Sequence, residues 1–207
     1  GELPLRPEIT PGFSVAGVLL MLSGSAYALV GIKSRWLHCL ISTAFLASLG
    51  VTVLLVYVMN PPVGKDLQGA YVAAAAGSGI ILGSVSFIFQ DFLECLACLL
   101  GGFCLCMWIL TLKPGGLLGS GGDGNIVFIT LLSAASVAAF FSRWTRTHFM
   151  IGCISLSGAT AIVLGIDCFS RAGLKEFWAY IWGLNDSIFP LGVDTFPLTK
   201  GIRVEQA

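Results

Sequence analysis

Charged side chains are scarce in this chain. Eleven basic and eleven acidic residues make up 11% of its 207 residues, whereas apolar residues make up 56%. Soluble domains carry roughly 25% charged residues, so the composition excludes an ordinary soluble fold. The balanced charge leaves no basic field to attract nucleic acid, which excludes a nucleic-acid partner. The composition predicts a polytopic membrane protein whose main partner is the lipid bilayer.

Motifs of catalysis are missing as well. The two histidines, His38 and His148, lie near the ends of apolar runs, and neither HExxH nor GxSxG occurs. The glycine-rich segment 113–125 lacks the strand and the lysine placement of a phosphate loop and is interpreted as a connector. We therefore predict that the protein is not an enzyme and holds no cofactor.

Four cysteines fall in one apolar run, with CxxC and CxC spacings that invite a metal or redox interpretation. They are Cys95, Cys98, Cys104 and Cys106. A structural zinc site needs four convergent ligands, and no histidine lies near them in the sequence. Apolar surroundings also raise the pKa of a thiol and disfavour the thiolate that binds metal. The sequence predicts no metal site.

Apolar runs bounded by proline, glycine and charge fill most of the chain. A helix needs about 20 apolar residues to cross a bilayer, and the run 67–112 is long enough that it must fold back on itself. We predict an all-α transmembrane helix bundle with six spans, forming one domain over 1–207. The predicted spans are 13–32, 37–59, 67–89, 92–112, 126–142 and 148–169.

A short amphipathic segment follows the sixth predicted span. Leu174, Phe177, Trp178 and Ile181 recur at helical spacing, and polar residues take the opposite face. A helix over 174–183 is too short to span a bilayer, so we predict that it lies at the membrane interface.

Glycines recur at helical spacing within the predicted spans, including a repeat every seven residues in the first. Lipid supplies no hydrophobic drive for helix association, and small residues allow helices to approach closely. These glycines therefore predict helix packing rather than a ligand site. They are Gly17, Gly24, Gly31, Gly79, Gly83, Gly101, Gly102, Gly158 and Gly165.

Two groups of ionisable residues lie at predicted membrane edges. Asp167 and Arg171 are four residues apart, which favours an ion pair on one helix face. The alternative is that Arg171 reaches lipid phosphate while Asp167 caps a helix or meets water. Asp91 and Glu94 are interpreted as charges at a solvated turn, with a cation site as the alternative.

Basic residues suggest an orientation. Lys33 with Arg35, and Arg143 with Arg146, carry uncompensated positive charge in short loops, which favours the cytosol for both. The turn at Asp91 then shares that side. The N-terminus, the glycine-rich loop and the segment after Arg171 are expected on the exoplasmic side, including the possible glycosylation site at Asn185.

Three segments have sequences that are distinctive rather than merely apolar: GGFCLCMWILTLKPGGL at 101–117, SGATAIVLGIDCFSRAGLKEFWAYIW at 157–182 and FPLTKGIRVE at 196–205. They resemble the seven-helix domain shared by transmembrane protein 198 and seven-transmembrane superfamily member 3, in its fungal branch. The resemblance implies a seventh span after Glu205, an exoplasmic N-terminus and a cytosolic tail. It implies no catalytic or ligand residues, and this chain ends at Ala207, before the expected seventh span.

These observations predict a non-enzymatic multi-pass membrane protein, scaffold-like or receptor-like, in the plasma membrane or an endomembrane. Its expected partners are other membrane proteins or a copy of itself. The alternative is an ion or small-solute channel or transporter that uses acidic residues at the membrane edge, namely Asp167, Asp91 and Glu94. The start at Gly1 without methionine suggests a processed chain or a fragment.

Overall fold

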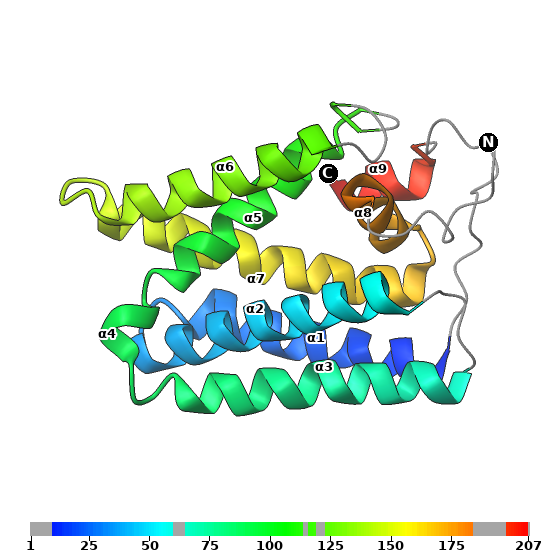
Figure 1. Ribbon diagram of the computed structural model, residues 1–207, viewed down its shortest axis with the longest axis horizontal. Helices are drawn as coiled ribbons and strands as arrows, with labels where there is room; N and C mark the ends of the chain where they lie inside the picture. The colour runs from blue at the N-terminus through cyan, green and yellow to red at the C-terminus, as the bar shows by residue number, and fades with distance from the viewer. Residues whose placement is uncertain (1–9, 60–64, 114–115, 119–122, 184–197, 207) are drawn as a thin grey trace.

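The computed structural model describes residues 10–59, 65–113, 116–118, 123–183 and 198–206. Over these ranges the chain forms helices and no strand, which confirms the predicted all-α bundle (Figure 1). The helices are α1 (Pro11–Val30), α2 (Arg35–Val58), α3 (Lys65–Val85), α4 (Gln90–Leu93), α5 (Leu96–Leu110), α6 (Asp123–Phe140), α7 (Arg146–Ser170), α8 (Leu174–Trp182) and α9 (Lys200–Gln206).

Six of these helices overlap the six predicted spans. By length and composition, α1, α2, α3 and α7 are long and apolar enough to cross a membrane, whereas α5 and α6 are shorter apolar helices. The 15 residues of α5 cover about 22 Å at 1.5 Å per residue, less than the roughly 30 Å hydrocarbon core of a bilayer.

Local hydrogen bonds explain where two helices begin and end. Thr10 precedes α1 and its side chain accepts a bond of 3.4 Å from the Phe13 N–H, while Pro11 fits the first turn, where no N–H is needed. The third predicted span is too long, because α3 ends at Val85. The Ser86 hydroxyl donates 2.6 Å to the Gly83 carbonyl and replaces the next helical bond there.

The fourth predicted span is interrupted rather than continuous. The four-residue α4 ends at Leu93, and α5 begins only at Leu96. Glu94 and Cys95 form the turn between them, and Glu94 is turned inward with 5% of its surface exposed. Hydropathy alone does not reveal this break, because Glu94 is the one charged residue in an otherwise apolar run.

The helices pack in neighbouring pairs. The main contacts join α1 to α7, α2 to α3, and α5 to both α6 and α7 (Figure 1). We call the end that contains α4 and the α6–α7 turn (residues 141–145) the α4 end, and the opposite end, with α8 and α9, the α8 end.

The α1–α7 contact is built from glycines on both helices. A Cβ atom at Gly24 would lie 2.8 Å from the Gly158 carbonyl oxygen, and one at Gly165 would lie 2.8 Å from the Gly17 carbonyl oxygen. A Cβ at Gly17 would also meet Cys168 at 2.9 Å. These distances leave no room for a side chain, so the seven-residue glycine repeat of α1 lies directly against α7.

The remaining glycines singled out in the sequence also lie at contacts between helices. A Cβ at Gly83 of α3 would lie 3.2 Å from the Cβ of Ala44 in α2, and Gly79 faces the same helix. In α5, Gly101 lies against Cys153 of α7, and Gly102 lies against Ser136 of α6. Gly31 is buried just after α1, where a Cβ would lie 3.3 Å from the Ile154 side chain.

The apolar face of α8 has different surroundings from those expected of an interfacial helix, while the place of α8 at the membrane interface stays a prediction. Its apolar face packs into the bundle rather than against lipid: Leu174, Phe177 and Ile181 have 0% exposed surface. Trp178 meets the rings of Phe103 and Trp108 edge-on, with centroid distances of 6.3 and 6.1 Å. Amphipathic spacing predicts a buried face but not what buries it, and here aromatic contacts with α5 do so.

Candidate functional site: buried carboxylates at the two ends of the bundle

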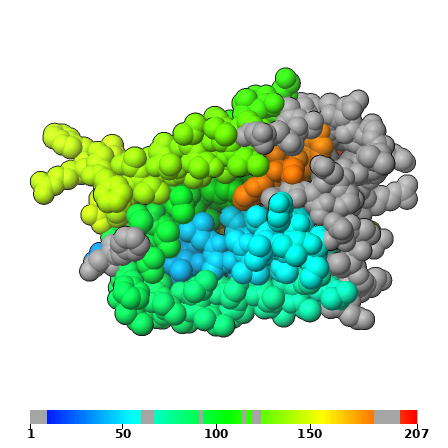
Figure 2. All heavy atoms as spheres, viewed as in Figure 1, coloured from blue at the N-terminus to red at the C-terminus, as the bar shows by residue number. Residues whose placement is uncertain are grey.

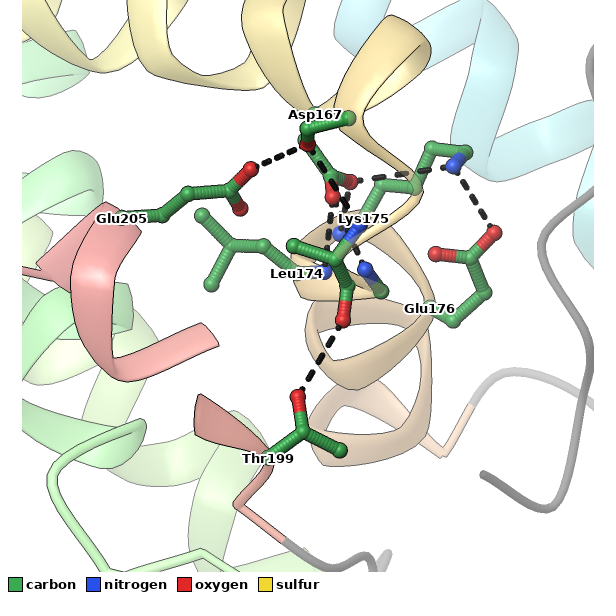
Figure 3. Close-up of polar contacts among 9 residues, drawn as sticks. Asp167, Leu174, Lys175, Glu176, Thr199 and Glu205 are labelled. Atoms are coloured by element: carbon green, nitrogen blue, oxygen red, sulfur yellow. Dashed lines mark hydrogen bonds and ion pairs between the residues drawn. The ribbon is translucent and has the colours of Figure 1, made fainter. Parts of the chain in front are cut away.

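Asp167 is fully buried in the last turn of α7, with 0% of its surface exposed. Its Oδ1 accepts hydrogen bonds from the N–H groups of Gly173 at 2.9 Å and Leu174 at 3.1 Å. Its Oδ2 accepts one from Lys175 at 2.8 Å. These N–H groups begin α8 and have no partner within that helix, so Asp167 caps α8 from the preceding helix (Figure 3). The positive end of the α8 dipole also favours a carboxylate there.

The counter-ion of Asp167 is Lys175, not Arg171 as predicted. The Lys175 Nζ lies 3.7 Å from Asp167 Oδ2 and 2.9 Å from Glu176 Oε1 (Figure 3). Burial lowers the pKa of Lys175, but the carboxylates of Glu176 and Asp167 outweigh it and raise that pKa above its usual value.

The predicted pair fails because α7 ends before it can form. Arg171 is the C-cap residue of α7 and adopts the left-handed conformation, with φ of 58°. Spacing of four residues aligns two side chains only while the helix continues. Arg171 is exposed and forms no ion pair with Asp167. The alternative weighed from sequence, in which Asp167 caps a helix, describes the geometry.

A third carboxylate joins this cluster from α9. Ser170 Oγ donates a hydrogen bond of 2.5 Å to Glu205 Oε1, while Glu205 Oε2 is buried without a hydrogen-bond partner among the described residues. Burial raises the pKa of Glu205 to about 7; the Ser170 bond opposes that rise and nearby Asp167 adds to it. Burial likewise raises the pKa of Glu176. The α8 end therefore holds three carboxylates, Asp167, Glu176 and Glu205, of which the first two pair with Lys175.

At the α4 end, Glu94 forms a second ionic centre. Its Oε2 lies 2.7 Å from Arg146 Nη2 and 3.0 Å from Arg35 Nη2. Its Oε1 lies 4.0 Å from the buried His38 Nε2. The prediction of a solvated turn is therefore wrong for Glu94. Two guanidinium groups offset the cost of burying the carboxylate, and together these contacts join α2, the α4–α5 turn and α7.

Two other predicted sites fall outside the described parts of the structure. The side chain of Asp91 is not described, so its pairing with Glu94 stays a prediction. Asn185, the possible glycosylation site, also lies outside the described residues.

Sequence reasoning missed Arg35 and Arg146 as partners of Glu94, although it placed all three on one side of the membrane. That shared side was a usable signal, since the turn with Asp91 and Glu94 contains no basic residue of its own. Nothing comparable pointed to Glu205, which reaches Ser170 across 35 positions of sequence.

A family model described as the TM7S3/TM198-like domain matches residues 17–207. The chain belongs to the TM7S3/TM198-like family. Both ionic centres lie within the matched range. Family membership and the long apolar helices together establish a multi-pass integral membrane protein. The fungal branch of the TM7S3/TM198-like family stays a prediction. Searches of curated proteins and of solved structures gave no match.

Proposed function

We propose that this TM7S3/TM198-like chain is a non-enzymatic membrane protein that organises partners by docking other transmembrane helices, or a second copy of itself, against α3. The observation that carries the proposal is the outward face of α3. This helix lies at the edge of the bundle, with α2 and α1 as its main contacts (Figure 1). Ala70, Ala73 and Ala74 are exposed, and Gly77 follows at helical spacing.

Small residues at this spacing are the usual surface for close helix association in lipid. A Cβ atom built at Gly77 meets nothing within 4 Å, so none of the described helices of this chain packs against that position. At the glycines of the α1–α7 and α2–α3 contacts, in contrast, a neighbouring helix already occupies the space beside the backbone. An open small-residue face on an edge helix therefore favours a partner from outside the bundle.

The test is association in lipid vesicles. Gly77→Leu is expected to reduce proximity between labelled chains, or between the chain and a co-purified membrane partner, because leucine holds the two backbones apart. Gly50→Leu in α2 is the matched control, since a Cβ there also meets nothing within 4 Å. Equal association in both variants would refute this role for α3.

Transport is the second candidate, supported by polar atoms in the bundle interior. Tyr27 Oη, Ser157 Oγ and Trp178 Nε1 are buried and have no hydrogen-bond partner among the described residues. Buried polar atoms at membrane depth mark functional paths often enough to require a test. Against transport, Asp167 and Glu94 are both held by structural contacts.

Flux measurements separate the two functions. Purified protein in vesicles, tested against protons, monovalent cations and small neutral solutes, is expected to show no flux above empty vesicles. A flux that Ser157→Ala or Tyr27→Phe abolishes, with thermal stability unchanged, would establish transport instead.

A further inference from the structure

A groove of about 300 Å³ lies between α5, α6 and α7, separate from both ionic centres. Leu105, Phe149 and Leu156 supply apolar walls, and Gly152 supplies a bare stretch of backbone. A Cβ atom at Gly152 would meet nothing within 4 Å. Leu105 is 41% exposed, so the groove opens on the outer side of the bundle, where the surroundings are lipid.

One end of this groove is basic. His148 also lines it and precedes Gly152 by four residues, so both lie on the same face of α7. His148 belongs to the first turn of α7, directly after the α6–α7 turn with Arg143 and Trp144. That turn projects beyond the rest of the α4 end (Figure 2), and Trp144 is 95% exposed.

No acidic residue offsets this charge within the α6–α7 hairpin. Between Asp123 and Asp167 the sequence contains no aspartate or glutamate. Arg146 is paired with Glu94, but the structure records no ion pair for Arg143 within the described residues. The groove therefore has a histidine in its lining, and an uncompensated arginine and an exposed indole lie five and four residues before that histidine in the chain.

We propose that this groove binds one acyl chain of an anionic phospholipid, with the lipid phosphate at Arg143 and His148. Basic pockets between transmembrane helices suit anionic head groups, and an exposed tryptophan suits the head-group layer. The volume is at the lower limit of small-molecule pockets and too small for a helix about 10 Å across. The apolar walls favour an acyl chain, and the basic residues favour a negatively charged head group.

The experiment uses the full chain in mild detergent with added phosphatidylglycerol or phosphatidylcholine of the same acyl chains. Native mass spectrometry is expected to retain phosphatidylglycerol, and thermal melting is expected to rise with that lipid alone. Arg143→Gln and His148→Gln should each weaken retention about fivefold by removing one head-group contact. Equal retention of both lipids would overturn the proposal.

Gly152→Leu tests the acyl-chain part, because its Cβ enters open space and the rest of the side chain occupies part of the groove. It should abolish retention of phosphatidylglycerol, while Gly50→Leu, which also enters open space, should leave it unchanged. Unchanged retention in Gly152→Leu, with melting equal to the parent chain, would overturn the site. A dimer lost in Gly152→Leu alone would assign the groove to a second copy and also overturn the proposal.

Discussion

Asp167 and Lys175 lie on different helices, eight residues apart in sequence, yet the Nζ–Oδ2 distance between them is 3.7 Å. The chain changes direction between them through the left-handed residues Arg171 and Gly173, with φ of 58° and 92°. Asp167 also accepts hydrogen bonds from the first N–H groups of α8. One carboxylate therefore both pairs with Lys175 and caps the start of the next helix.

Replacement of Asp167 is expected to be costly. Asp167→Asn removes one of the two carboxylates that pair with Lys175 and one acceptor of the α8 cap, and should destabilise the fold by about 3 to 5 kcal/mol. Arg171→Ala should change stability by less than about 0.5 kcal/mol, since Arg171 is exposed and unpaired with Asp167. Melting in one detergent measures both.

A double-mutant cycle distinguishes the two possible partners of Asp167. Asp167→Asn combined with Lys175→Gln should cost less than the sum of the single changes, whereas Asp167→Asn with Arg171→Gln should be additive. Coupling to Arg171 with none to Lys175 would contradict the geometry.

Loss of Glu94 should loosen the α4 end. Glu94→Gln leaves Arg35 and Arg146 without their shared carboxylate and should lower stability by about 2 to 3 kcal/mol, because both hydrogen bonds are charge-assisted. Lys33→Gln, an exposed charge at the same end, serves as the control and should have little effect. Hydrogen exchange should rise in the first turns of α2 and α7, and unchanged protection there would be evidence against the ionic centre.

The tight α1–α7 contact predicts a large effect of a side chain at Gly24. Gly24→Leu should destabilise the fold by at least about 1 to 3 kcal/mol, since its Cβ would lie 2.8 Å from the Gly158 carbonyl oxygen, a backbone atom. Gly50→Leu should be nearly neutral. Equal melting temperatures for the two variants would refute the close packing.

The pH dependence of α9 docking follows from Glu205. Its pKa rises from an ordinary 4.5 to about 7 in the folded chain, mainly through burial, with Asp167 raising it and Lys175 opposing it. The folded state therefore binds more protons than the unfolded state between these values, and stability falls as pH increases from about 4.5 to about 7. Protection factors of the α9 amides, which correct for the intrinsic increase of exchange with pH, should fall across that window. Glu205→Gln should remove most of the dependence, and an unchanged pH profile in that variant would exclude Glu205 as its source.

The proposed orientation can be tested with a reporter in the glycine-rich loop. A cysteine at Ser120 in a background without accessible native cysteines is expected to react with an impermeant reagent from the exoplasmic side. Labelling only from the cytosolic side would reverse the orientation of every span.

Hydropathy located most helices to within a few residues, because apolar length and bounding charges depend on sequence alone. Glycine spacing likewise identified the faces of α1 and α3 that meet neighbours. The partners of Glu94 could not be read in this way, since Arg35 and Arg146 are 59 and 52 residues away. Asp167 pairs with Lys175 and not with Arg171 because the left-handed Arg171 ends α7. A periodic sequence pattern does not predict that ending.

The α1–α7 contact has a consequence for the order in which the protein is assembled. A ribosome completes α1 well before α7, so the face with Gly17, Gly24 and Gly31 enters the membrane without its final neighbour. Until α7 is inserted, that face is open to lipid or to a chaperone of the membrane. Chains that terminate before α7 would therefore expose a surface that the complete bundle buries. Cellular quality control could recognise incomplete chains by this exposed face of α1.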